Sequence, residues 1–264
     1  MKPSHAKMLE EADIVFWIGE SIETSLEEPL ESIAKSAEVV EFMEVETIAK
    51  LKFREESIFG DHDDHDDHDD HDDHDDHDDH DDHDDHDDHD EHAHGEHDPH
   101  AWLSIENAQT WLNLVAGKLS AADPENAGVY FANAAEARAE IDELVKEVNN
   151  ILEPVRGRNF VVFHDAYQYF ETSFDFPAAG AISLGDASDP SAARIAEIQD
   201  RVKDEGINCV LSEPQYNPNL VTTVLSGTDA KTGVIDPLGA SLEPGPNLYR
   251  DLIRNMAKSL AGCL

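Results

Sequence analysis

Histidine recurs at every third position through a long acidic tract, in which residues 61–90 repeat Asp-Asp-His. Each imidazole offers a nitrogen donor to a metal ion, and the neighbouring carboxylates raise the local concentration of cations. We expect weak, multiple and poorly selective sites for zinc, nickel and copper. A solvated charge run without a metal role is the alternative, although solubility does not require such regular histidines. The candidate loop ligands are His62, His65, His68, His71, His74, His77, His80, His83, His86, His89, His92, His94 and His97.

His100 is a second kind of candidate, because it follows Asp98 and Pro99 rather than the repeat itself. Proline fixes its own φ angle and restricts the residue before it. We therefore expect a stiff corner that presents His100 in one direction. The competing interpretation is that His100 is only the last histidine of the tract.

Two more candidates end apolar runs. His164 ends Phe-Val-Val-Phe-His, and Asp236 ends Gly-Val-Ile-Asp before a proline. In open α/β sheets, ligands bind beyond the carboxyl ends of the strands, and a neutral imidazole is a good zinc ligand. The alternatives without a metal role are that His164 is a structural histidine and that Asp236 belongs to a turn-forming Asp-Pro pair.

The rest of the chain predicts the scaffold for these side chains. Helical and strand-like segments alternate, which favours parallel sheets covered by helices. We expect an α/β protein of two lobes, each with a mainly parallel sheet flanked by helices, joined by a long rigid helix. Helices are predicted at residues 4–11, 26–37, 104–119, 124–152, 165–172, 191–205, 219–226 and 247–260. Strands are predicted at residues 13–19, 38–42, 159–164, 178–184, 207–212 and 233–236.

The same pattern divides the chain into three parts. Residues 1–121 form an N-terminal lobe, residues 122–153 the linking helix and residues 154–264 the C-terminal lobe. Within the first lobe, residues 61–97 are expected to be a disordered loop, because a run of charges cannot bury apolar surface.

Composition excludes several classes of function. The formal charge is −42, and no basic stripe is present that could follow a phosphate backbone, so nucleic acid is a poor partner. No apolar run approaches the roughly 20 residues of a membrane span. The beginning, MKPSHAKMLEEAD, lacks the apolar core of a signal peptide. Cys209 and Cys263 do not form a CxxC pair; they are either two buried thiols or a disulfide.

Several stretches together resemble the zinc-binding periplasmic component of bacterial ABC importers (the ZnuA type), within the zinc/manganese solute-binding family. They are PSHAKMLEEADIVFWIGESIE, the histidine-rich loop, DPHAWLS, FHDAYQYF, CVLSEPQYNP, VIDPLGASLEPG and the terminal SLAGCL. They run from one end of the chain to the other.

The resemblance implies a set of site residues. DPHAW implies a zinc ligand at His100 and FHDAY a second at His164, where manganese-importing relatives tend to have glutamate. The IDPLG stretch aligns Asp236 with a carboxylate that completes the metal shell in some relatives, and water is the alternative there. A disulfide between Cys209 and Cys263 is implied as well. A further ligand histidine is expected a few residues upstream of Met1, together with an export signal and an opening strand.

The expected function is therefore capture of Zn²⁺ in the periplasm and its delivery to the membrane permease of an ABC importer, by a monomer that is not an enzyme. Two alternatives stay open. A metal buffer would act through the Asp/His tract alone, with many weak sites. A metallohydrolase would use His100, His164 and Asp236 to cleave a phosphate or acyl ester.

Overall fold

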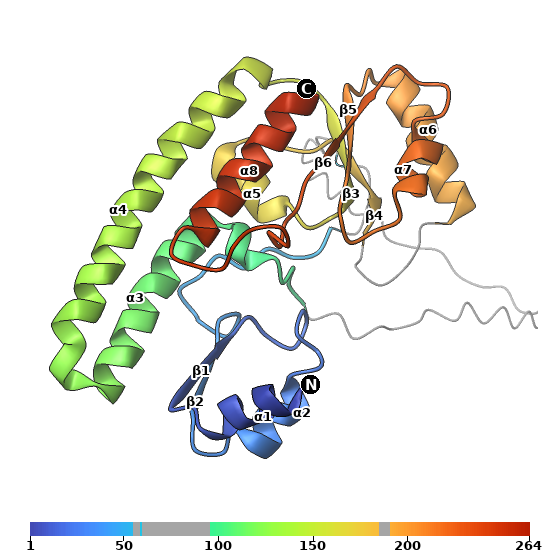
Figure 1. Ribbon diagram of the computed structural model, residues 1–264. Helices are drawn as coiled ribbons and strands as arrows, with labels where there is room; N and C mark the ends of the chain where they lie inside the picture. The colour runs from blue at the N-terminus through green and yellow to red at the C-terminus, as the bar shows by residue number, and fades with distance from the viewer. Residues whose placement is uncertain (55–58, 60–95, 185–190) are drawn as a thin grey trace, which may run out of the picture.

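The computed structural model describes residues 1–54, 59, 96–184 and 191–264. Its N-terminal part is a small α/β unit in which two parallel strands carry two helices (Figure 1). Trp17, Leu30 and Ala34 form the buried core between this sheet and its helices. The elements are α1 (Pro3–Glu10), β1 (Ile14–Trp17), α2 (Glu27–Ile33) and β2 (Glu38–Glu41).

A long helix, α4 (Ala127–Leu152), runs along one side of the molecule next to α3 (Ile105–Ala122) and α8 (Leu248–Cys263) (Figure 1). Ser104 begins α3 as predicted, because its hydroxyl accepts a hydrogen bond from the backbone of Asn107 at 3.2 Å. A 3₁₀ turn, Pro124–Asn126, leads into α4. At 1.5 Å per residue, the 26 residues of α4 extend about 39 Å.

The C-terminal part is a four-stranded parallel sheet in the order β4-β3-β5-β6. Its strands are β3 (Phe160–His164), β4 (Gly180–Ser183), β5 (Cys209–Ser212) and β6 (Lys231–Val234). The remaining helices are α5 (Gln168–Phe174), α6 (Ala192–Asp204) and α7 (Pro218–Val224), with 3₁₀ turns at Ala101–Leu103 and Glu153–Val155.

Strand β3 is buried on both faces, and its alternate residues belong to two different cores. Phe160 and Val162 belong to the core shared with α4, α5 and α8. Val161 and Phe163 belong to the core formed with α6 and α7. This double burial explains why β3 is apolar at every position before His164.

A disulfide between Cys209 and Cys263 fastens α8 to β5, with 5.8 Å between the two Cα atoms. The neighbouring strand passes close to it at Gly233, where a Cβ atom would lie 3.1 Å from the Cβ of Cys263. The bond implied by the family resemblance is thus present, and glycine leaves the room that it needs.

The predicted fold class is confirmed, and several element bounds are corrected. The helix expected at residues 26–37 ends at Ile33, and the strand expected at residues 13–19 is limited to Ile14–Trp17. The strand expected at residues 233–236 lies two residues earlier, so Asp236 follows β6 instead of ending it. The helix expected at residue 165 begins at Gln168, because the backbone of Asp165 first bonds to Ser183 of β4. The boundaries proposed for the lobes stay predictions, and most of the expected disordered loop lies outside the described residues. Among the described helices, none combines the length and apolarity needed to cross a bilayer.

Candidate metal centre

His100 and His164 lie next to each other, although they come from distant parts of the sequence. Their ring centroids are 5.4 Å apart and their ring planes form an angle of 62°. His164 is the last residue of β3, and His100 lies in the corner that precedes the first 3₁₀ turn. Each residue is 4% exposed. The fold therefore brings together two of the three folded-site residues predicted from sequence.

The corner at His100 is held by Asp98, which is itself buried. One oxygen of Asp98 accepts hydrogen bonds from the backbone nitrogen of His100 at 2.9 Å and from its Nδ1 at 2.7 Å. The backbone of Asp98 is fixed in turn, because its N–H donates to the carbonyl of Leu51 and its own carbonyl accepts from the hydroxyl of Tyr169. This geometry is the stiff corner that Pro99 predicts.

Glu213 holds His164 in the same manner. Its Oε1 lies 2.6 Å from Nδ1 of His164 and accepts from the backbone nitrogen of that residue at 3.3 Å. Glu213 directly follows β5, the strand next to β3. Carboxyl ends of neighbouring parallel strands meet at one edge of the sheet, which places this pair there.

The two carboxylates decide which ring nitrogen faces a ligand. Because a carboxylate accepts the Nδ1 proton, the neutral form of each imidazole carries its lone pair on Nε2. A carboxylate behind a histidine also makes that nitrogen more basic, an arrangement that recurs behind metal-binding histidines. The two Nε2 atoms are therefore the candidate metal-binding atoms of this site.

Aromatic side chains surround the two imidazoles. The ring of Trp102 is 5.2 Å from that of His100, and the ring of Tyr216 is 5.2 Å from that of His164. Tyr167 lies 6.1 Å from His164; burial, followed by the charge of Glu213, raises the pKa of its hydroxyl well above the usual value. Aromatic rings therefore line part of the site.

The carboxylate of Asp236 forms hydrogen bonds with the backbone of the loop that follows it. Its Oδ1 accepts from the backbone nitrogens of Leu238 and Gly239 and from the side chain of Gln215, and its Oδ2 accepts from the nitrogen of Ala240 at 2.7 Å. This is the geometry of a turn-forming aspartate. The loop still contacts the site, since Nε1 of Trp102 donates to the carbonyl of Pro237 at 2.9 Å.

A buried ionic cluster lies beside the two histidines. The guanidinium of Arg54 is 2.8 Å from Asp165 and 2.7 Å from Glu171, and both carboxyl groups are buried. Burial raises the pKa of Asp165 to about 6, with added contributions from the charges of Glu171 and Asp98, while Arg54 lowers it. Negative charge is therefore concentrated around the imidazoles.

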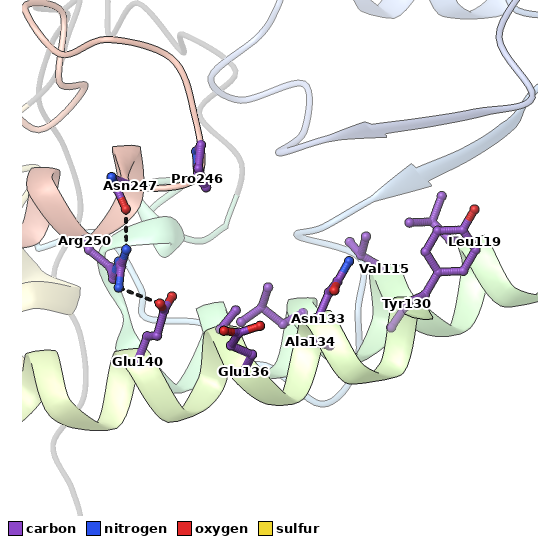
Figure 2. A pocket seen from close by; sticks show the side chains of 13 residues that line it. Val115, Leu119, Tyr130, Asn133, Ala134, Glu136, Glu140, Pro246, Asn247 and Arg250 are labelled. Carbon is purple, nitrogen blue, oxygen red and sulfur yellow. Dashed lines mark hydrogen bonds and ion pairs between the residues drawn. The ribbon is translucent and has the colours of Figure 1, made fainter. Parts of the chain in front are cut away.

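A cavity of about 610 Å³ lies elsewhere. Figure 2 shows it between α3 and α4, with Arg250 paired to Glu140 at one end and Tyr130 near the other. Its lining is mostly apolar and includes neither His100 nor His164. We therefore place the candidate site at the histidine pair and not in this cavity.

Within the described ranges, no group of three or more His, Cys, Asp or Glu side chains is close enough to hold a metal ion together. The predicted tract ligands from His62 to His94 lie outside those ranges. His97 is described, and it forms an antiparallel bridge with Lys52. The structure thus brings the rings of His100 and His164 together, while the carboxylate of Asp236 accepts hydrogen bonds within its own turn.

Comparison with known proteins decides the family. A sequence model described as "ZnuA: Zinc-uptake complex component A periplasmic" matches residues 1–263. The chain belongs to this family.

Relatives of this family match the chain along its whole length. A Brucella abortus protein named "High-affinity zinc uptake system protein ZnuA" is 49% identical over 268 residues, covering 100% of this chain and 80% of its own length. The protein of the same name from Paracoccus denitrificans is 47% identical over 265 residues, with the same two shares. A solved structure, "Crystal structure of ZnuA", has a TM-score of 0.73 at 22% identity and covers 99% of this chain and 83% of its own. At that identity, the structural likeness establishes the fold.

Sequence reasoning about this ZnuA-family chain missed three side chains of the site: Asp98, Glu213 and Arg54. Glu213 follows an apolar strand directly, which is the same signal that pointed to His164. Asp98 stands two residues before His100, a spacing from which a short side chain reaches back to the backbone and ring. Nothing in the sequence around Arg54 indicates which carboxylates it meets, because those partners are more than a hundred residues away.

Proposed function

We propose that this chain captures zinc outside the cytoplasm and delivers it to the membrane permease of an ABC importer. His100 and His164 bind the ion through their Nε2 atoms. The observation that carries the proposal is the pair of buried imidazoles, each held at Nδ1 by its own carboxylate. Membership of a zinc-uptake family supports it.

The charges around the site favour a cation. Four carboxyl groups are buried close to the imidazoles, and the guanidinium of Arg54 pairs with two of them. The other two face the imidazoles. A buried charge is costly unless it is paired, so a divalent ion stabilises this arrangement. The four are Asp98, Asp165, Glu171 and Glu213.

The donor atoms favour zinc over manganese. Imidazole nitrogen suits zinc, copper and nickel, whereas manganese prefers carboxylate, carbonyl and water oxygens. A histidine at position 164 therefore selects against manganese. Zinc takes four ligands at about 2.0–2.1 Å from nitrogen, so two imidazoles supply half of a tetrahedral shell.

The remaining positions are assigned to water or to a further protein donor. Asp236 is a predicted donor, but it would have to release hydrogen bonds from three backbone nitrogens before it could bind metal. We expect Asp236→Asn to change the zinc affinity far less than His164→Ala does. A comparable loss in the two variants would assign Asp236 to the shell.

The proposal is transport and not catalysis. A metallohydrolase at this site would turn over a phosphate or acyl ester when zinc is bound. We expect no zinc-dependent turnover of either class, and delivery of the bound ion to permease-containing membranes instead. Accumulation of zinc in vesicles that contain the permease, measured with and without this chain, tests the delivery step.

Metal buffering by the Asp/His tract is the second candidate, favoured by the repeat itself. Calorimetric titration with zinc separates the two functions when the chain is compared with a variant that lacks residues 61–91. We expect one tight site to survive the deletion and to vanish with His164→Ala. His5 is an exposed histidine, and His5→Ala is the matched control that keeps the tight site. Weak sites alone, all lost with the tract, would leave buffering as the function.

A further inference from the structure

Residues 51–54 connect the two sides of the histidine pair. The carbonyl of Leu51 accepts from the backbone of Asp98 at 2.8 Å, beside the corner that carries His100. The nitrogen of Leu51 donates at 2.9 Å to the hydroxyl of Tyr169, which belongs to α5. This short segment therefore bonds to the His100 corner and to the helix that follows β3.

Arg54 ends this segment with a forked ion pair. Its Nη2 lies 2.7 Å from Oε2 of Glu171, and its Nη1 lies 2.8 Å from Oδ1 of Asp165 and 3.3 Å from Oε1 of Glu171. The aromatic ring of Phe59 packs on the guanidinium, with 3.8 Å from Cζ to the ring centroid. A guanidinium fork fixes direction as well as charge, which an ammonium group does not.

The partners of the fork are themselves held in place. Oε2 of Glu171 also accepts from the backbone of Ala178, which leads into β4. The backbone of Asp165 donates to Ser183 at 3.1 Å, so both carboxylates are fixed to the sheet. Asp165 directly follows His164 in the chain. Arg54 is thus connected to His164, the last residue of β3, through the single residue Asp165.

We propose that Arg54 is a positioning residue of the zinc site, which holds the end of β3 and the His100 corner at the separation that a single ion requires. It also balances two buried carboxylates, so that their repulsion does not spread the site apart. This inference rests on the proposed function, because it assigns a role at the same pair of imidazoles. It adds a residue that contacts neither the ion nor its ligands.

The chain provides a matched control in Arg254. That guanidinium forks onto Glu147, with distances of 2.7 and 2.9 Å, and also bonds to Asp251 at 2.6 Å. The side chains of Arg54 and Arg254 are 21% and 24% exposed. Arg254 joins α8 to α4 and forms no contact with the histidine pair. The two arginines have similar exposure, but their forks lie in different places, and the carboxylates paired with Arg54 are 5% and 4% exposed whereas those paired with Arg254 are 43% and 45% exposed.

The test compares Arg54→Gln, Arg54→Lys and Arg254→Gln in the full chain. Zinc affinity is measured by competition with a chelator strong enough to keep weak tract sites empty. We expect Arg54→Gln to lower the affinity about tenfold, the lower end of the effect of residues that orient metal ligands. Arg54→Lys should recover part of the loss, and Arg254→Gln should bind zinc like the unmodified chain.

A second readout separates positioning from general stability. Cobalt(II) absorption reports the ligand geometry, and we expect Arg54→Gln to shift the bands while Arg254→Gln leaves them unchanged. Unchanged affinity and spectra in Arg54→Gln would overturn this inference alone, as would equal losses in the two glutamine variants. An unmodified chain without a tight zinc site would overturn the proposed function and this inference together.

Discussion

The carboxylate of Glu213 lies 2.6 Å from Nδ1 of His164, and it reaches that ring from the next strand of the sheet. The contact fixes both the direction and the tautomer of the imidazole. The contact requires the two residues to lie at the carboxyl ends of neighbouring parallel strands, His164 as the last residue of β3 and Glu213 directly after β5. The first prediction concerns this carboxylate.

We predict that Glu213→Gln lowers the affinity for zinc about 10- to 100-fold, because the amide no longer makes Nε2 of His164 more basic. Competition with a chelator measures the change. Glu243 is exposed, and Glu243→Gln serves as the control that should bind like the unmodified chain. Equal affinities for the two variants would show that the contact contributes nothing to metal binding.

The disulfide is predicted to stabilise the fold without tuning the site. It spans 54 residues, and closing a loop of that length in the unfolded chain is worth about 4 kcal/mol in the chain-entropy account. Denaturant unfolding of Cys263→Ser should show most of that loss in the free energy of unfolding. Zinc affinity should change less than twofold at temperatures where the variant is folded. A loss below about 1 kcal/mol would contradict the account.

Asn107 is predicted to be essential for stability. Its side chain is fully buried, accepts from the nitrogen of Ala49 and donates to the carbonyls of Ala49 and Ala101. Asn107→Ala removes all three of these hydrogen bonds to the backbone, at a cost of about 2–3 kcal/mol in the free energy of unfolding. Asn113 is exposed on the same helix, and Asn113→Ala should cost far less. Similar losses in the two variants would refute the assignment.

Asp165 is predicted to make the stability of the metal-free protein depend on pH. Its pKa is about 6 when folded and 3.8 when unperturbed, so the folded state binds the proton more tightly. The contribution of Asp165 to stability is therefore complete below about pH 4 and is lost as the pH rises through about 6. The loss by pH 7 is on the order of 3 kcal/mol.

The comparison of Asp165→Asn with the unmodified protein isolates this effect, because other titrating groups cancel. The variant should gain stability relative to the unmodified protein between pH 4 and pH 7. Asp175 is exposed, and Asp175→Asn should show no such trend. A stability difference that stays flat over this range for Asp165→Asn would contradict the prediction.

Much of the fold could be predicted, because local sequence patterns indicate where strands and helices form. The apolar run before His164 predicted a buried strand, and Ser104 predicted the start of α3. The strand before Asp236 was misplaced by two residues because its first positions, Lys231 and Thr232, are exposed and polar. A search for apolar runs misses an edge strand such as β6, because edge strands often carry exposed polar residues.

The site was predictable only in part. His100 and His164 stand in motifs that carry their own signal. Their meeting depends on the packing of two distant segments, and so does the fork from Arg54. The tight turn around Asp236 equally requires the backbone of the following residues to fold back on its carboxylate. Local sequence specifies the donors, whereas tertiary packing determines which of them converge.

The central claim is that one zinc ion binds between Nε2 of His100 and Nε2 of His164. The most direct test is anomalous diffraction at the zinc edge from crystals of the variant that lacks residues 61–91, grown with zinc. We predict one strong peak at about 2.0–2.1 Å from both nitrogen atoms. A peak bound to only one of the two imidazoles, or located elsewhere on the molecule, would contradict the account.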